Sequence, residues 1–175
     1  SGILSRTNYN YDFDYKMIHL FDLDLTIWDC FNKHNDPIWA KQMVFPFNNT
    51  DDVIVDDVGS ICILREGVKN FLKYLQSGNN KIGFVSAGKH PSIPYEHQQS
   101  VHLLRKFGIY NHFNFIKRLE SKIYDKTLDV KFVVDKIVFY DDNDDVLNKM
   151  KQFKHVTAVD SKELDWNDLI GKKYD

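Results

Sequence analysis

Cysteine is scarce in this sequence of 175 residues, which has only Cys30 and Cys62 and no Cys-x-x-Cys pair. That scarcity excludes a disulfide-stapled miniprotein, gives no zinc-binding pattern, and indicates reduced thiols in a cytosolic protein. No apolar run approaches the ~18 residues of a membrane span, and no segment like the apolar core of a signal peptide precedes the first predicted strand. We therefore expect a cytoplasmic location and no membrane partner.

The sequence also lacks an excess of charge of either sign. Its 23 lysines and arginines face 25 aspartates and glutamates, for a net charge of −2. No broad basic surface for nucleic acid is indicated, although a local basic groove is compatible with these numbers. What the sequence does have is 43% hydrophobic and 14% aromatic residues. That content is enough for the core of one globular domain and excludes a disordered or collagen-like chain.

Short apolar runs alternate with amphipathic stretches along most of the chain. We predict strands at residues 17–21, 81–86, 113–116, 136–140 and 155–159, and helices at about 65–77, 95–107, 121–134, 144–152 and 165–170. Strands that alternate with helices form a parallel sheet with right-handed crossovers. The predicted fold is therefore α/β, with a Rossmann-like parallel sheet of about five strands and helices on both faces.

Two segments fall outside this alternation. Residues 1–15, rich in Tyr, Asn and Asp, are predicted to form a loose arm ahead of a single domain at residues 16–175. Residues 31–64 contain three short apolar runs separated by turn-forming residues, which predicts a β-hairpin or a small three-stranded flap inserted after the first strand. The insertion is too short for a large cap domain, so we expect none.

Polar residues follow three of the predicted strands. Asp22, Asp24 and Thr26 come after the first strand, Ser86 ends the second, and the acidic run at 141–145 follows the fourth. Ligands of open α/β sheets bind beyond the carboxyl ends of the strands, where the strand order reverses. If the first strand lies between the second and the fourth, these groups meet, and carboxylates so close together repel one another unless a cation is present. A hard divalent ion with oxygen ligands, Mg²⁺, is the expected cofactor.

At this point the sequence resembles a known family. Residues 19–28 (HLFDLDLTIW) resemble the DxDxT motif of the haloacid dehalogenase (HAD) superfamily of phosphotransferases. Val85-Ser86 is similar to the second motif of that superfamily, and residues 139–142 (FYDD) are similar to its acidic fourth motif. Trp28 and residues 103–109 (LLRKFGI) resemble the small magnesium-dependent phosphatases within it. The resemblance spans roughly residues 17–160, with three motifs in the expected order.

The resemblance implies a phosphatase that hydrolyses a phosphomonoester through an aspartyl-phosphate intermediate. Asp22 is the expected nucleophile, and Asp24 is the expected general acid and base. The implied Mg²⁺ ligands are Asp22, the backbone carbonyl of Asp24 and an aspartate of the fourth motif. Ser86 is expected to donate a hydrogen bond to a phosphoryl oxygen, and a lysine is expected to neutralise charge on the transferring group.

The third-motif lysine has two candidates. Lys122 follows Ser121, a good helix N-cap, so it is predicted to begin the helix that leads to the fourth strand. The Ser-Lys-Ile stretch also resembles the third motif of the subgroup, and we prefer Lys122 to Lys126.

The metal ligands of the fourth motif also stay open. The family pattern places an Asp or Asn four residues after the second acid, where this sequence has Val146. Either Asp141 or Asp142 is therefore the primary ligand. Asp145, four residues after Asp141, is expected to position the lysine or a metal-bound water.

The remaining site predictions concern the substrate. The expected substrate-binding residues are Thr26, Trp28, Ser86, Ala87, Gly88 and His90. An uncapped site suits bulky substrates in this superfamily, so the expected partner is a phosphorylated small molecule, a phosphoprotein or a nucleic-acid end.

Two alternatives remain beside this interpretation. The first keeps the fold but makes the protein a polynucleotide end-processing phosphatase, with a basic strip of Lys89, His90, Arg105, Lys106, Lys117 and Arg118. The second is a catalytically idle binding domain, against which the intact and mutually repelling carboxylates argue.

Overall fold

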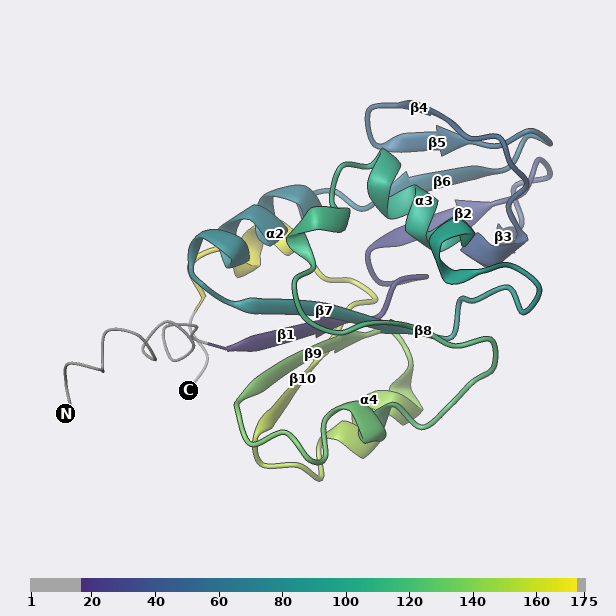
Figure 1. Cartoon of the computed structure of the whole chain (residues 1–175). Coiled ribbons are helices and arrows are strands. Elements are labelled where there is room, and N and C mark those ends of the chain that lie inside the picture. Colours follow the sequence, from purple (N-terminus) through teal and green to yellow (C-terminus); the bar gives the residue numbers. More distant parts are fainter. Residues whose placement is uncertain (1–16, 173–175) are drawn as a thin grey trace.

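The computed structural model describes residues 17–172, so the arm predicted at residues 1–15 lies outside the described residues. The described chain forms two five-stranded sheets (Figure 1). The first sheet has the order β10-β9-β1-β7-β8, and every neighbouring pair in it is parallel. Its strands are β1 (Ile18–Phe21), β7 (Lys81–Ser86), β8 (Lys117–Leu119), β9 (Ile137–Asp141) and β10 (Val156–Asp160). The predicted α/β fold with a five-stranded parallel sheet is confirmed.

β1 is the central strand of this sheet, and all four of its residues are buried. It pairs in parallel with β7 on one side and with β9 on the other. Its residues other than His19 are apolar, as expected of a strand whose two faces are both covered. The first predicted strand therefore does lie between the second and the fourth, which brings their carboxyl ends to one place.

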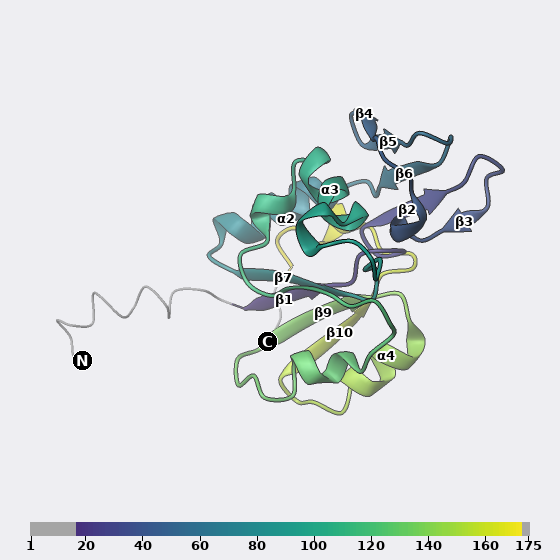
Figure 2. The same cartoon turned by 45° about the vertical axis from the view of Figure 1, so that its right-hand side comes forward.

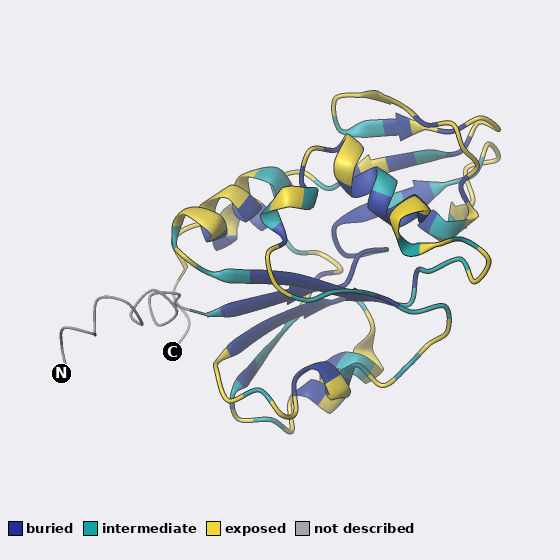
Figure 3. Ribbon diagram, in the orientation of Figure 1, coloured by how far each residue is buried: buried dark blue, intermediate teal, exposed yellow. Residues whose placement is uncertain are grey.

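Helices pack on the two sides of this sheet (Figures 1 and 2). α2 (Val68–Ser77) and α3 (Gln99–Lys106) lie on one side, and α4 (Asp144–Met150) lies on the other. Figure 3 shows β1, β7 and β9 buried and the outward surfaces of the helices exposed. Short 3-10 helices complete the chain, namely η1 (Ala40–Gln42), η2 (Tyr95–His97), η3 (Tyr110–His112), η4 (Lys126–Asp129) and η5 (Trp166–Leu169). Between residues 17 and 172 no helix has the length and apolar character needed to cross a membrane.

The second sheet is antiparallel and stands beyond the carboxyl ends of the parallel strands (Figure 2). Its order is β3-β2-β6-β5-β4, with β2 (Trp28–Phe31), β3 (Pro37–Ile38), β4 (Asn48–Thr50), β5 (Val53–Val55) and β6 (Ile61–Leu64). It begins earlier and has more strands than the hairpin flap expected at residues 31–64. The apolar run at 43–47 is not a strand, because Pro46 has no N–H to donate to a ladder.

Two predicted elements of the parallel half differ from the structure. The third strand begins at Lys117 rather than at residue 113, because the side chain of Asn114 accepts the N–H of Ile82 across 2.9 Å before the ladder starts. The helix predicted at 121–134 is reduced to η4. Its cap is Asp125, whose side chain accepts the N–H of Thr127 across 3.0 Å.

Candidate active site

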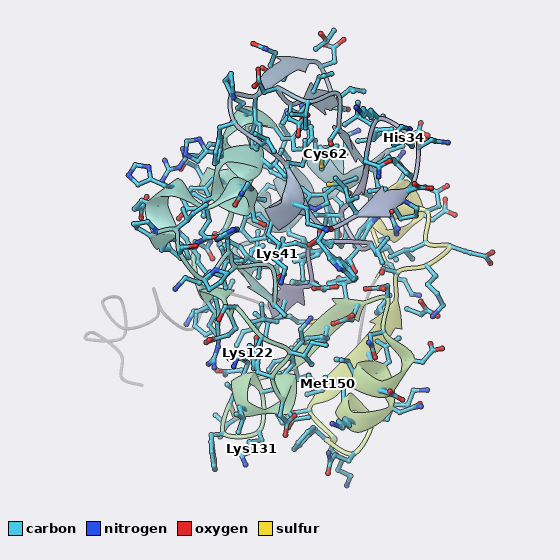
Figure 4. The ribbon with its side chains drawn as sticks, turned by 90° about the vertical axis from the view of Figure 1, so that its right-hand side faces the viewer. His34, Lys41, Cys62, Lys122, Lys131 and Met150 are labelled. Atoms are coloured by element: carbon cyan, nitrogen blue, oxygen red, sulfur yellow. The ribbon has the colours of Figure 1, made fainter. Side chains whose placement is uncertain are left out.

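The carboxyl ends of β1, β7 and β9 open into a pocket of about 260 Å³. Figure 4 looks onto this end of the parallel sheet. The acidic residues Asp22, Asp24, Asp141 and Asp142 line the pocket together with Lys126. Its other lining residues are Trp39, Lys41, Ser86, Ala87, Gly88, Ile123, Tyr124, Asn143 and Val146. The three sets of polar strand ends found in the sequence therefore share one cavity.

Lys126 joins two of the carboxylates. Its Nζ donates to Oδ1 of Asp22 across 3.0 Å and to Oδ2 of Asp141 across 2.8 Å, and the lysine side chain is only 10% exposed. Burial acts to lower the pKa of Lys126, but the two carboxylates outweigh burial and hold the pKa above its usual value. Lys126 is therefore a fixed positive charge beside Asp22.

Asp22, Asp141 and Asp142 form a compact acidic cluster. One carboxylate oxygen from each lies within 4.8 Å of the other two. Burial raises the pKa of all three side chains, and that of Asp22 rises to about 6 against the lowering effect of Lys126. Oδ1 of Asp141 also accepts the backbone N–H of Asn143 across 3.0 Å. Three carboxylates against one ammonium, with oxygen donors only, fit a hard divalent cation such as Mg²⁺.

Asp24 occupies different surroundings from Asp22. Its Oδ1 accepts the indole Nε1–H of Trp28 across 3.0 Å and the backbone N–H of Ala40 across 2.9 Å. Burial raises the pKa of Asp24 to about 6, although these two hydrogen bonds favour the charged form. The carboxylate of Asp24 is therefore anchored through one oxygen by the antiparallel sheet and by η1.

The loop after β7 lies close to Asp24. The backbone N–H of Gly88 lies 3.2 Å from Oγ of Ser86. A Cβ added at Gly88 would come within 3.1 Å of that hydroxyl and within 3.4 Å of Oδ2 of Asp24. The lack of a side chain here keeps the space between Ser86 and Asp24 open. Thr26 is fully buried, and its Oγ1 lies 3.4 Å from Oδ2 of Asp22 and 2.9 Å from Oγ of Ser161.

Five residues expected at the site do not line the pocket, and Thr26 is one of them. Lys122 is exposed and does not line the pocket, because the helix expected to begin there starts at Lys126 instead (Figure 4). Asp145 is exposed on α4 and belongs neither to the acidic cluster nor to the pocket lining. His90 lines a separate hollow, and its ring nitrogen lies 3.1 Å from Oγ of Ser92. Trp28 is fully buried outside the pocket lining, where it donates a hydrogen bond to Asp24.

Sequence reasoning missed two lining residues. Lys41 belongs to η1, at a distance along the chain from every motif, and no spacing rule marks it. Tyr124 packs against the guanidinium of Arg118 at 4.6 Å and donates its hydroxyl to Asp129 across 2.9 Å. Trp39, 49% exposed, also lines the pocket. Exposed aromatic side chains are enriched at binding surfaces, but the exposure of Trp39 is known only from the structure, so it gave no signal in the sequence.

No family model matches the sequence, and no curated protein matches it. Nine chains of solved structures do match. One is Fcp1, described as an essential RNA polymerase II CTD phosphatase, with a TM-score of 0.46, 13% identity, and 91% of this chain covered against 45% of that chain. Another is an Arg-to-Ala variant of fission yeast Fcp1 bound to beryllium fluoride, with a TM-score of 0.45, 12% identity, and coverage of 98% and 50%. The present chain spans about half the length of each of these two structures.

Proposed function

We propose that this protein is a HAD-type phosphatase that hydrolyses a phosphomonoester through an aspartyl-phosphate on Asp22. The observation that carries the proposal is the different setting of two carboxylates that are close in the sequence. Asp22 faces Lys126 and the acidic cluster, whereas Asp24 stands apart from that cluster on two N–H donors. A pair of carboxyl groups in unlike surroundings is what a nucleophile and a proton donor require.

In the first step a carboxylate oxygen of Asp22 forms a bond to phosphorus while the bond from phosphorus to the leaving oxygen breaks. The ammonium of Lys126, 3.0 Å from Asp22, offsets the negative charge of the transferring group. The hydroxyl of Ser86 faces the same pocket and is placed to hydrogen-bond a phosphoryl oxygen. These residues bind and orient the phosphoryl group in line with Asp22.

Asp24 moves the protons. With Oδ1 held by Trp28 and Ala40, the carboxyl group presents Oδ2 toward the space beside Gly88. There it donates a proton to the departing oxygen, and in the second step it takes a proton from the water that hydrolyses the aspartyl-phosphate. A pKa of about 6 leaves Asp24 able to act as both acid and base near neutral pH.

Mg²⁺ fits the acidic cluster, and Asp22 and Asp142 are the ligands we propose, because Lys126 and the N–H of Asn143 already engage Asp141. When bound, the ion supplies positive charge that lowers the pKa of Asp22 and stabilises negative charge on the phosphoryl oxygens. Asp141 then keeps Lys126 aimed at Asp22.

A nucleic-acid substrate is not favoured by any contact of the basic strip. Arg105 pairs with Glu96 across 3.0 Å, and Arg118 pairs with Glu120 and Asp129. The charge of these two arginines is compensated within the chain, which leaves less of the basic strip available to a nucleic acid.

The test is hydrolysis of p-nitrophenyl phosphate with and without Mg²⁺, by the wild-type protein and by Asp22→Asn. Asn keeps the size of the side chain but cannot form the acyl phosphate. We expect magnesium-dependent turnover that the substitution abolishes. Turnover that survives Asp22→Asn contradicts the mechanism, and an absence of turnover in the wild type contradicts the phosphatase assignment for aryl esters.

A further inference from the structure

The pocket contains a second lysine that the proposed mechanism does not use. Lys41 lies in η1 and lines the pocket between Trp39 and Ala87. Its Nζ lies 3.5 Å from the backbone carbonyl of Ala87, and among residues 17–172 no carboxylate forms an ion pair with it. Lys126, in contrast, is held by two carboxylates. Lys41 therefore carries a charge that the chain itself leaves available to a ligand.

Lys41 stands on the Asp24 side of the pocket. The preceding residue, Ala40, donates its N–H to Asp24 across 2.9 Å. The carbonyl beside Lys41 belongs to Ala87, which precedes Gly88, and a Cβ added at Gly88 would lie 3.4 Å from Oδ2 of Asp24. Lys126 acts instead on Asp22 and Asp141. The two ammonium groups thus line one cavity but have different neighbours (Figure 4 labels Lys41).

The space beyond Lys41 is open. A second hollow, of about 470 Å³, is also lined by Lys41, together with Val44, Phe45 and Pro91. Val44 is 44% exposed and Phe45 is 36% exposed. A group that leaves the catalytic pocket past Lys41 therefore meets the exposed apolar side chains of this second hollow, which shares Lys41 with the pocket and is also lined by His90.

The proposed function decides which part of a substrate passes there. Because Asp24 protonates the leaving oxygen, the leaving group must lie on the Asp24 side, whereas the phosphoryl group lies against Asp22 and Lys126. We propose that Lys41 binds an anionic group on the leaving group. The preferred substrate is then a phosphomonoester of an alcohol or phenol that also carries a negatively charged substituent, such as a carboxylate. Trp39 covers the apolar part of that leaving group. This inference rests on the proposed function.

The experiment compares phenyl phosphate, 4-carboxyphenyl phosphate and 4-(aminomethyl)phenyl phosphate as substrates of the wild type, Lys41→Met, Lys41→Glu and Lys122→Met. The quantity is the ratio of kcat/KM for the anionic substrate to that for phenyl phosphate, because the intrinsic reactivity of each ester cancels between variants. We expect Lys41→Met to lower this ratio about tenfold through the loss of one charge-assisted contact. Lys41→Glu should shift preference to the cationic substrate, and Lys122→Met should leave the ratio unchanged.

Two results overturn the inference. An equal loss on all three substrates in Lys41→Met would mean that Lys41 serves the phosphoryl group. An equal fall of the ratio in Lys122→Met would mean that only the general field of the protein matters. If the wild type hydrolyses none of the esters, the phosphatase proposal fails by itself. Calorimetry then measures the binding of the uncleavable 4-carboxybenzylphosphonate. Tighter binding to the wild type than to Lys41→Met supports the role of Lys41 in binding the anionic group, and equal binding refutes that role.

Discussion

The indole Nε1 of Trp28 donates a hydrogen bond to Oδ1 of Asp24 across 3.0 Å, and both side chains are buried. Trp28 belongs to the antiparallel sheet, whereas Asp24 follows the central strand of the parallel sheet. The antiparallel sheet therefore holds Asp24, the proposed acid, in place. We expect Trp28 to contribute to activity by positioning Asp24.

Trp28→Phe tests this positioning role. The substitution removes the N–H donor while keeping an aromatic ring, so Asp24 retains only the N–H of Ala40. We expect kcat for an aryl phosphate to fall about tenfold or more, with a loss of about 1–2 kcal/mol in the free energy of unfolding. Trp166→Phe is the matched control, because Trp166 is equally buried and its Nε1 has no hydrogen-bond partner among residues 17–172. An equal loss of kcat in both variants would contradict a specific role for the Trp28 donor.

Lys126→Met tests which lysine serves the site. Removal of Lys126 leaves Asp22 and Asp141 without their ammonium, so we expect kcat to fall about 100-fold or more. Lys122→Met removes the same charge from an exposed position, and steady-state kinetics should show little change. A larger fall of kcat in Lys122→Met than in Lys126→Met would instead support Lys122, the lysine preferred from the sequence.

Magnesium should stabilise the folded protein through the acidic cluster. A ligand that binds only the folded state raises the free energy of unfolding by about 1.4 kcal/mol at about ten times its Kd, which a thermal melt with and without MgCl₂ detects. Asp142→Asn should abolish the rise. Asp145→Asn, which changes an exposed carboxylate outside the cluster, should retain it. An unchanged rise in Asp142→Asn would remove Asp142 from the ligand set.

Stability should depend on pH through His19. Burial lowers the pKa of His19 to about 4 from its usual value of 6.5, and its Nδ1 lies 2.8 Å from the hydroxyl of Tyr140. The unfolded chain therefore protonates His19 below about pH 6.5, whereas the folded protein protonates it only below about pH 4. The contribution of His19 is complete above pH 6.5 and is lost as the pH falls, by up to about 3 kcal/mol.

The measurement is urea unfolding between pH 7 and pH 4 for the wild type and His19→Asn, which keeps a polar atom near Nδ1. The raised pKa values of Asp22 and Asp24 act in the opposite direction over this range, so the difference between the two proteins isolates the histidine. The wild type should lose more stability on acidification than the variant. Parallel curves would refute the prediction.

The sequence was sufficient for the parallel sheet and for the acids at its edge, because buried strands are continuous apolar runs and their ends carry the polar residues. It failed at Lys126, because Ser121 looks like a helix cap, whereas the cap that forms is Asp125. The expected helix would bury too little apolar surface to be stable, since Ile123, Phe132 and Val134 are 84–95% exposed.

Lys41 could not have been found by spacing, because it reaches the site only through the packing of η1 against Asp24. The extent of the antiparallel sheet could likewise not be predicted from the sequence. In the sequence, Trp28 looks like the apolar end of the first motif. In the structure it is also the first residue of β2, which only the pairing of β2 with β6 reveals.

The most direct test of the central claim is to trap the phosphorylated protein. In Asp24→Asn, p-nitrophenyl phosphate can still transfer its phosphoryl group to Asp22, because this leaving group departs without a proton, but the base for hydrolysis is missing. Borohydride reduction converts an aspartyl-phosphate to homoserine, which peptide mass spectrometry can locate. The account predicts homoserine at position 22 in Asp24→Asn, and none in Asp22→Asn. Homoserine at another aspartate, or p-nitrophenol release by Asp24→Asn with no modified residue, would contradict it.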